Sequence, residues 1–123
     1  MNREELMQMK AGPELDALIA EKNMGFTWQV AYYSFTQSGK DIKKGENYLQ
    51  SPNGYVYIPA YSTNDSAALL VAKTFDHFQI EKLSNDYWVF LGREKKYAIM
   101  HKSLAMAICL AAYWLFVNGE IKS

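Results

Sequence analysis

The longest apolar stretch of the chain lies near its C-terminus, at residues 104–117. Its fourteen residues, LAMAICLAAYWLFV, include no charged side chain, and Ser103 precedes them. Alanine, leucine and methionine favour an α-helix, and a helix that is apolar on every side belongs in a protein interior. At about 1.5 Å per residue the stretch is roughly 21 Å long, too short for a hydrocarbon core of about 30 Å. We therefore expect a central buried helix.

Helix signals also mark the first part of the chain. Asn2 is a favourable N-cap for a short helix over residues 3–10, with Glu5 at the spacing of a capping box. Pro13 suits the first turn of a second helix, and Gly25 supplies its C-terminal stop. The apolar residues between them recur at helical spacing, at Leu15, Leu18 and Ile19. Two N-terminal helices are therefore predicted.

The apolar pattern changes to a period of two at residues 28–35. Both faces are apolar or aromatic, which predicts a strand covered on both sides. The polar, glycine-rich segment 36–54 follows, and we expect it to be a long irregular loop of the kind that is often functional. Residues 55–58 then predict a short second strand. The lysines of the loop are candidates for anion contacts, unless the loop is simply solvated: Lys40, Lys43 and Lys44.

A third helix is predicted to start near residues 61–65. Ser62 and Asp65 have the spacing of a capping box, with aspartate in place of the usual glutamate. A regular apolar stripe predicts that this helix runs to about His77, through Ala68, Val71, Ala72, Phe75 and Phe78.

Residues 86–91 and 97–101 predict two more strands, which residues 92–96 join as a hairpin loop. The predicted order is helix, helix, strand, strand, helix, strand, strand, helix. This order suits an α+β fold, namely an α/β/α sandwich with a roughly four-stranded mixed or antiparallel sheet. Residues 1–123 contain no repeat or low-complexity tract, so we expect a single domain.

Composition narrows the classes of partner. Lys+Arg and Asp+Glu both number 13, so the formal net charge is zero, and the basic excess typical of nucleic-acid-binding proteins is missing. A chain without net charge is poorly protected against self-association, so we expect a homo-oligomer. The opening residues MNREELMQMK contain charges and no apolar signal-peptide core. We therefore expect a cytoplasmic protein with neither nucleic acid nor membrane as a partner.

The sequence lacks motifs for catalysis or metal binding. Cys109 lies inside the apolar stretch, where a thiol is buried and inert. His77 and His101 have no second ligand at metal spacing, and no HExxH, CxxC or nucleotide-binding glycine loop occurs. We therefore expect no metal, no cofactor and no catalytic residue, with a site assembled from distant residues left open.

The helix start near residues 61–65, the tyrosines and the hairpin loop are better suited to binding a ligand than to catalysis. Unsatisfied backbone N–H groups at the start of the third helix attract anions, and nine tyrosines are available for stacking. Arg93 and Lys95 add positive charge in the hairpin loop. A site for a small phosphorylated, nucleotide-like ligand is predicted at Tyr61, Ser62, Thr63, Asn64, Arg93 and Lys95. The simpler alternatives are an N-cap that satisfies its own helix and an ordinary hairpin tip.

Three blocks of the chain resemble one known family. They are MNREELMQMKAGPELDALIAEKNMG (1–25), PAYSTNDSAALLVAKTF (59–75) and LAMAICLAAYWL (104–115). In these blocks the chain resembles the phage ABA-sandwich domain family of small phage and prophage proteins. The resemblance implies an α/β/α sandwich and an origin in a bacteriophage or prophage of a Gram-positive host, and it carries over no catalytic residues.

The resemblance also implies a kind of function. Small non-structural phage proteins are often accessory proteins, including inhibitors of host defence, and some sequester a nucleotide-derived immune signal without changing it. We therefore expect a non-enzymatic accessory binding protein that acts as a sponge for such a signal in the host cytoplasm. Two alternatives remain. One is a protein-interaction module that inhibits a host protein through an exposed aromatic surface, and the other is a phosphodiesterase-like enzyme.

Overall fold

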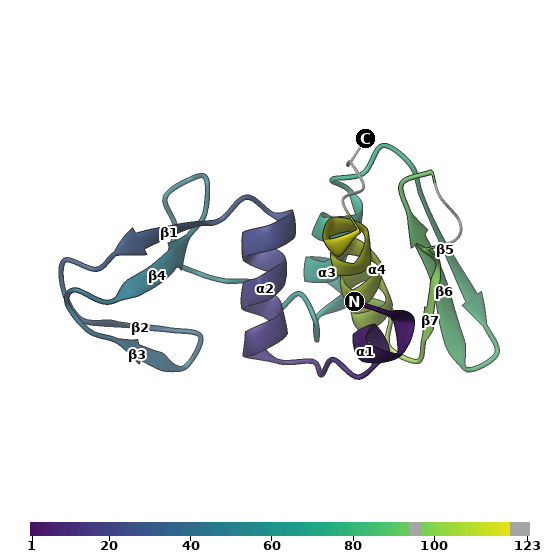
Figure 1. Ribbon diagram of the computed structural model, residues 1–123, viewed down its shortest axis with the longest axis horizontal. Helices are drawn as coiled ribbons and strands as arrows, with labels where there is room; N and C mark the ends of the chain where they lie inside the picture. Colours follow the sequence, from purple (N-terminus) through teal and green to yellow (C-terminus); the bar gives the residue numbers. More distant parts are fainter. Residues whose placement is uncertain (94–96, 119–123) are drawn as a thin grey trace.

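The computed structural model describes residues 1–93 and 97–118. The helices in this part of the chain are α1 (Arg3–Met7), α2 (Pro13–Asn23), α3 (Asp65–Ala72) and α4 (Leu104–Val117). The strands are β1 (Thr27–Val30), β2 (Phe35–Gln37), β3 (Lys40–Ile42), β4 (Asn47–Gln50), β5 (Phe78–Leu83), β6 (Asp86–Leu91) and β7 (Ile99–His101). Figure 1 shows an elongated molecule, with β1 to β4 at one end and β5 to β7 at the other.

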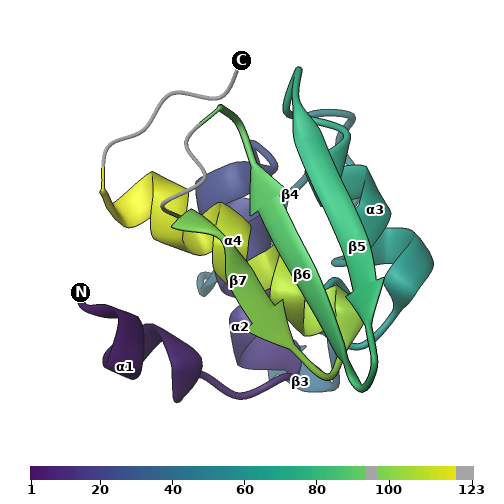
Figure 2. The same cartoon turned by 90° about the vertical axis from the view of Figure 1, so that its right-hand side faces the viewer.

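Helix α4 is the centre of the main body and spans the residues that the sequence predicts. It contacts α2, α3, β6 and β7 (Figures 1 and 2). Ser103 is its N-cap, and the Ser103 Oγ accepts a hydrogen bond from the backbone N–H of Met106 at 3.2 Å. Residues 105–112 are at most 4% exposed. The expected central buried helix is therefore confirmed, and the chain's own elements cover its residues 105–112.

Both N-terminal helices form as predicted, although α1 is shorter than expected. The Asn2 side chain caps α1 by accepting a hydrogen bond from the backbone N–H of Glu5 at 2.8 Å. Pro13 is the first residue of α2. Gly25, just beyond the end of α2, has a φ of 77°, where an L side chain would be strained.

Strands β5, β6 and β7 form an antiparallel sheet beside α4 (Figure 2). The two predicted strands of this region are present, although the second begins at Ile99 rather than Tyr97. Val89 and Leu91 of β6 turn into the hydrophobic core with Ile99 of β7. This sheet and the helices supply most residues of the hydrophobic core.

The predicted end of the third helix is wrong. The sequence extends the helix to about His77, whereas α3 ends at Ala72 and Phe78 already belongs to β5, which was not predicted. Phe75 and Phe78 continue the helical spacing of the apolar stripe, so periodicity alone could not reveal the turn between them. The hydroxyl of Thr74 donates to the carbonyl of Val71 at 2.7 Å, within the turn that ends the helix.

Residues 27–57, which we call the hairpin module, replace the predicted long loop. Strand β1 pairs with β4, and β2 pairs with β3, both antiparallel. Ser38 and Gly39 connect β2 to β3 with φ angles of 52° and 77°. Two consecutive residues with positive φ are typical of the tightest hairpins. The expectation of an irregular loop over residues 36–54 is therefore wrong, because that segment contains three strands.

Two other predictions for the hairpin module are also wrong. The strand expected over residues 28–35 is interrupted, since β1 ends at Val30, and all four residues of β1 are exposed rather than covered. Residues 55–58 form no strand. Instead the carbonyl of Val56 accepts a hydrogen bond from the side chain of Gln37 at 2.6 Å. The module consists of two-stranded sheets only, and it has too few elements to cover both faces of β1.

The fold is an α+β sandwich, as predicted, but the sheet count differs. Within residues 1–93 and 97–118 the strands form three antiparallel sheets, β1-β4, β2-β3 and β5-β6-β7, rather than one four-stranded sheet. From one end to the other, Figure 1 shows the hairpin module, α2, the pair α3 and α4, and the β5-β6-β7 sheet. Among the described residues, no helix combines the length and apolar character needed to cross a membrane.

Candidate functional site

A buried polar contact joins α2 to the segment that leads into α3. The carboxylate oxygen Oδ1 of Asp16 accepts hydrogen bonds from the backbone N–H and the hydroxyl of Ser62, at 2.7 and 2.6 Å. The Ser62 hydroxyl oxygen accepts in turn from the backbone N–H of Gly12 at 2.8 Å. Asp16 is 7% exposed and Ser62 is 1% exposed. Ser62, a predicted ligand-binding residue, therefore directs both of its donors into the protein.

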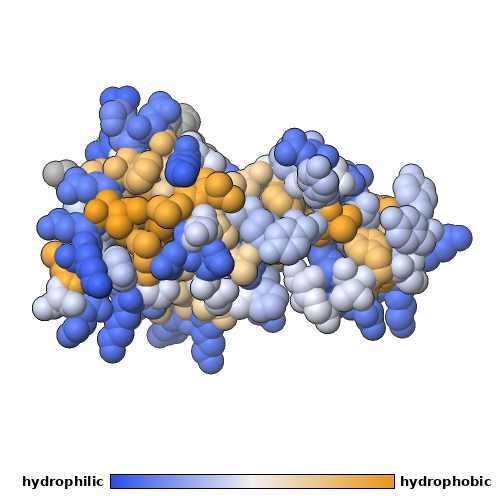
Figure 3. Space-filling view, turned by 180° about the vertical axis from the view of Figure 1, so that it is seen from behind, coloured by the Kyte–Doolittle hydropathy of each residue, from blue (hydrophilic) through white to orange (hydrophobic). Residues whose placement is uncertain are grey.

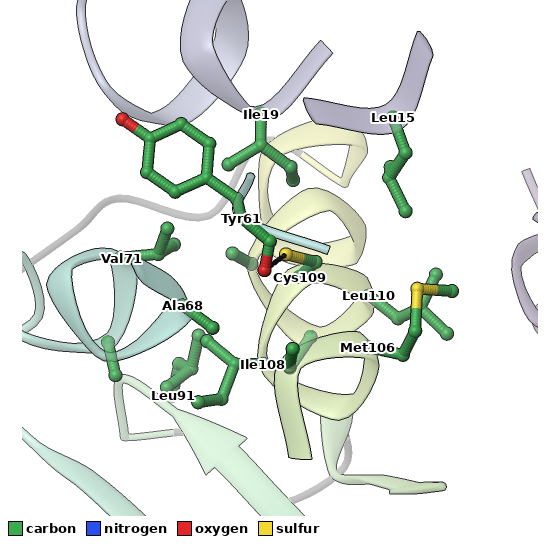
Figure 4. Packing of buried hydrophobic residues seen from close by; sticks show 14 of the residues in the cluster. Leu15, Ile19, Tyr61, Ala68, Val71, Leu91, Met106, Ile108, Cys109 and Leu110 are labelled. Atoms are coloured by element: carbon green, nitrogen blue, oxygen red, sulfur yellow. Dashed lines mark hydrogen bonds between the residues drawn. The ribbon is translucent and has the colours of Figure 1, made fainter. Parts of the chain in front are cut away.

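Tyr61 and Cys109 lie in the hydrophobic core beside this contact (Figure 4). The Cys109 thiol donates to the carbonyl oxygen of Tyr61 at 3.2 Å. Burial raises the pKa of the Cys109 thiol to about 12, and the negative charge of Asp16 adds to the effect. Burial also raises the pKa of Tyr61 to about 12. Both groups stay protonated at neutral pH, and the expected buried position of Cys109 is confirmed.

The raised pKa of Cys109 predicts a loss of stability in alkaline solution. In the unfolded chain the thiol ionises near its ordinary pKa of 9.0, whereas the folded chain keeps the proton until about pH 12. Between these values folding takes up a proton, so the free energy of unfolding falls by about 1.4 kcal/mol per pH unit. Urea denaturation above pH 9 should show a shallower loss for Cys109→Ala than for the unmodified protein. Equal slopes for the two proteins would contradict the raised pKa.

Thr63 and Asn64 are exposed at the start of α3, and their backbone N–H groups are hydrogen-bonded within the chain. Asn64 is the N-cap of α3, and its side chain accepts from the backbone N–H of Ala67 at 2.9 Å. The backbone N–H groups of Thr63 and Asn64 both donate to the carbonyl of Ala60. The sequence places the cap at Ser62, two residues too early. These hydrogen bonds fit the alternative interpretation, an N-cap that satisfies its own helix.

The two predicted parts of the site lie apart. Arg93 is exposed in the β6–β7 connection, directly after Gly92, which lies next to the side chain of Leu115 in the last turn of α4. Tyr61 instead contacts Cys109, six residues earlier in α4 and therefore about 9 Å away along the helix axis. Lys95 lies outside the described residues.

A cleft separates α2 from the hairpin module. Its volume is about 230 Å³, and Pro13 and Ala17 line it from the side of α2. Its floor is apolar and formed by Ile42, Leu49 and Ile58, each at most 8% exposed. An open hollow of about 440 Å³ adjoins the cleft and shares part of its lining. Figure 3 shows from behind how the molecule narrows where the hairpin module meets the body.

The rim of the cleft carries an aromatic ring and charged groups of both signs. Trp28 and Lys40 line both the cleft and the adjoining hollow, and Trp28 remains 55% exposed. An accessible indole offers a stacking surface, and an ammonium group contacts phosphate. The carboxylates of Glu14 and Glu46 also line the space and can accept hydrogen bonds from ligand hydroxyls. Small-molecule sites commonly have volumes of about 300 Å³ or more. The cleft and the adjoining hollow together reach that volume.

Sequence reasoning missed the cleft because its two walls are separate in the sequence. The sequence predicts that Trp28 lies on a covered strand, whereas β1 is exposed. Lys40 is detectable from the sequence, because it is one of the three lysines that are candidates for anion contacts. What the sequence could not show is that the hairpin module folds back toward α2. Within the described residues, no group of three histidine, cysteine, aspartate or glutamate side chains could hold a metal ion.

The hairpin module also carries strongly exposed tyrosines. Its four most exposed tyrosines are Tyr32, Tyr33, Tyr57 and Tyr55, at 86%, 72%, 70% and 69%. None of them lines the cleft. Tyrosine is enriched in protein interaction surfaces. The hairpin module therefore carries exposed aromatic side chains outside the cleft.

Comparison with known proteins assigns the chain to a family. A family model described as the phage ABA sandwich domain matches residues 17–113. The chain belongs to this family. The matched part of this phage ABA sandwich domain begins within α2, includes the whole hairpin module and α3, and ends within α4. It therefore contains both the cleft floor and the Ser62 side of the buried polar contact, and the resemblance expected from the sequence is confirmed. Neither a curated protein nor a solved structure matches the chain.

Proposed function

We propose that this phage ABA sandwich protein is a non-enzymatic accessory protein that sequesters a small phosphorylated, nucleotide-like ligand. The observation that carries the proposal is the cleft between α2 and the hairpin module, where Trp28 and Lys40 line the same space. A nucleobase stacks on an aromatic ring, and a phosphate is attracted by a lysine ammonium group. The apolar floor excludes water from the face of the base, which strengthens both contacts.

Binding without chemistry is favoured by the lining of the cleft, which among the described residues includes one serine, Ser38, and no cysteine or histidine. Ser62 and Cys109 are buried and hydrogen-bonded within the chain, and neither lines the cleft. A phosphodiesterase would need a nucleophile or an activated water molecule at the ligand phosphate. A sponge needs only affinity. Because the family is a phage family, we propose a nucleotide-derived signal of host defence as the class of ligand, for example a cyclic nucleotide or a cyclic ADP-ribose-type molecule.

Titration calorimetry against a panel of nucleotides, cyclic nucleotides and cyclic ADP-ribose-type molecules tests this proposal. We expect at least one of them to bind, and Trp28→Ala to weaken its binding by about tenfold or more, since stacking on an aromatic residue contributes about 1–3 kcal/mol. Lys40→Ala should weaken binding and reduce its dependence on salt. Tyr55→Ala and Lys44→Ala are matched controls, because they change an exposed tyrosine and an exposed lysine of the same module outside the cleft.

No heat across the panel would contradict the proposal, and so would equal losses in the cleft variants and the controls. The bound molecule should be recovered unchanged after heat denaturation of the complex. Recovery of a hydrolysed product would instead support the phosphodiesterase alternative.

The second candidate is a module that inhibits a host protein through the exposed tyrosines. The observation that favours it is the exposure of Tyr32 and Tyr33, which no element of the described chain covers. We propose the same surface for the self-association expected from the zero net charge. A host protein that binds in stoichiometric amount, with no nucleotide bound by the cleft, would favour this candidate over the first.

A further inference from the structure

One polar side chain that lines the cleft, that of Gln37, is hydrogen-bonded to the described residues through the NH₂ half of its amide only. Gln37 is 9% exposed and lines the cleft. Its Nε2 donates to the carbonyl of Leu49 at 2.7 Å and to the carbonyl of Val56 at 2.6 Å. Because the NH₂ half of an amide is its donor half, two carbonyl partners fix which way the amide faces. The orientation of the Gln37 side chain is therefore set by the module itself.

The other half of the same amide, Oε1 of Gln37, has no partner. Within residues 1–93 and 97–118, no donor reaches this oxygen. A fully buried oxygen without a partner would be an unsatisfied buried acceptor, and Oε1 of Gln37 is not one. Oε1 is therefore accessible to solvent, and Gln37 lines the cleft. An oriented acceptor at an otherwise buried position is a group that a ligand donor can satisfy.

The hairpin places this acceptor next to the cation of the cleft. Gln37 and Lys40 face each other directly across the β2–β3 hairpin, on the two sides of its tight turn. Residues directly opposite in an antiparallel pair project from the same face of the sheet. Both side chains line the cleft, together with the indole of Trp28. A hydrogen-bond acceptor on Gln37, the cation of Lys40 and the aromatic ring of Trp28 therefore belong to the same cleft.

We propose that Gln37 Oε1 reads an N–H donor on the base of the bound nucleotide, while Trp28 stacks on the base and Lys40 contacts the phosphate. This inference rests on the proposed function and deepens it by naming the residue that selects the ligand. An amide oxygen whose NH₂ partner is already engaged can accept a hydrogen bond but cannot donate one. The cleft therefore selects a base that presents an N–H group and discriminates against one in which that N–H is blocked.

The test changes the ligand rather than Gln37, because Gln37→Ala would also leave the carbonyls of Leu49 and Val56 without their partner. The nucleotide that binds best in the calorimetric panel is compared with its analogues in which each base N–H is replaced in turn by N-methyl or C–H. We expect one analogue to bind at least about tenfold more weakly, since binding it would leave Oε1 desolvated and unpaired. An analogue that carries a methyl group on a ring carbon of the base, with every base N–H intact, serves as a control for added bulk.

A second measurement locates the effect at Gln37. The side-chain NH₂ signals of Gln37 should shift in an NMR spectrum when the parent nucleotide binds, and shift much less with the weak analogue. Equal affinities for the parent nucleotide and all its base analogues would overturn the role of Gln37 and leave the sponge proposal standing. Failure of every nucleotide to bind would overturn the sponge proposal itself. Binding of a peptide in the cleft in place of nucleotides would show that the acceptor serves a backbone N–H group instead.

Discussion

Replacing Leu110 with aspartate is expected to unfold the protein. Leu110 lies at the middle of α4 and is 0% exposed within the single chain. Removing a buried leucine side chain costs about 2–5 kcal/mol, and burying an unpaired carboxylate costs several kcal/mol more. The total is comparable to the whole stability of a typical domain, about 5–15 kcal/mol. Circular dichroism should therefore show no cooperative thermal transition for Leu110→Asp.

Phe116→Asp is the matched control, because it makes a similar change on the same helix at a position that is 44% exposed. This variant should retain a cooperative transition. A folded Leu110→Asp protein would show that α4 is not the centre of the core. A folded Leu110→Asp protein that is also monomeric, where the unmodified protein is oligomeric, would place this part of α4 in a subunit interface.

Asp16→Ala is expected to lower the free energy of unfolding by about 1–3 kcal/mol, because it leaves the buried backbone N–H of Ser62 without a partner. The Ser62 hydroxyl loses its bond at 2.6 Å and, among the described residues, keeps only the carbonyl of Gly12 as an acceptor, at 3.3 Å. The change should also weaken ligand binding. Ala17, beside Asp16, lines the cleft from α2, and Ile58, just before the Ser62 segment, forms its floor. The Asp16–Ser62 contact therefore sets the spacing of two cleft walls. Urea denaturation and calorimetry on the same variant measure the two effects.

Two variants calibrate this result. Asp16→Asn keeps a side-chain oxygen that can accept from Ser62, so its loss of stability should be smaller than that of Asp16→Ala. Glu14→Ala removes an exposed carboxylate from the first turn of the same helix and should cost no more than about 1 kcal/mol. Equal stability of Asp16→Ala and Glu14→Ala would contradict a structural role for the Asp16–Ser62 contact.

The sequence predicts the helical part of the body well because the helix signals are local. Ser103 caps α4 and Pro13 opens α2, as expected from adjacent residues alone. The unbroken apolar run of α4 could belong only to an interior helix, and the structure places it there. Strand β6 was likewise marked by a compact apolar and aromatic run between turn residues.

The hairpin module escaped prediction because its strands are short and polar. The segment KDI of β3 has a single buried residue, Ile42. Such a strand has no apolar alternation, and its existence depends on pairing with β2 across the Ser38-Gly39 turn. Glycine and lysine content therefore indicated a loop, although the serine–glycine pair was itself a turn signal.

The candidate site depends on contacts that are remote in the sequence. The sequence offers Ser62 as a ligand-binding residue because it precedes a helix, and it cannot show that Asp16, 46 positions earlier, takes up both Ser62 donors. The cleft has the same origin, since α2 and the β2–β3 hairpin are brought together only by the fold. The sequence predicts a nucleotide-like site near the start of α3, whereas the site that we propose is the cleft between α2 and the hairpin module.

An NMR titration that follows the tryptophan indole N–H signals tests the location of the ligand most directly. The chain has three tryptophans, at Trp28 in the cleft, Trp88 in the β5-β6-β7 sheet and Trp114 in α4. On addition of the nucleotide that binds best, the signal of Trp28 should shift with the same affinity that calorimetry measures, and the other two should not. A ligand that saturates the protein while the Trp28 signal stays in place, or that shifts the backbone signals of Tyr61 to Asn64 instead, would contradict binding in the cleft between α2 and the hairpin module.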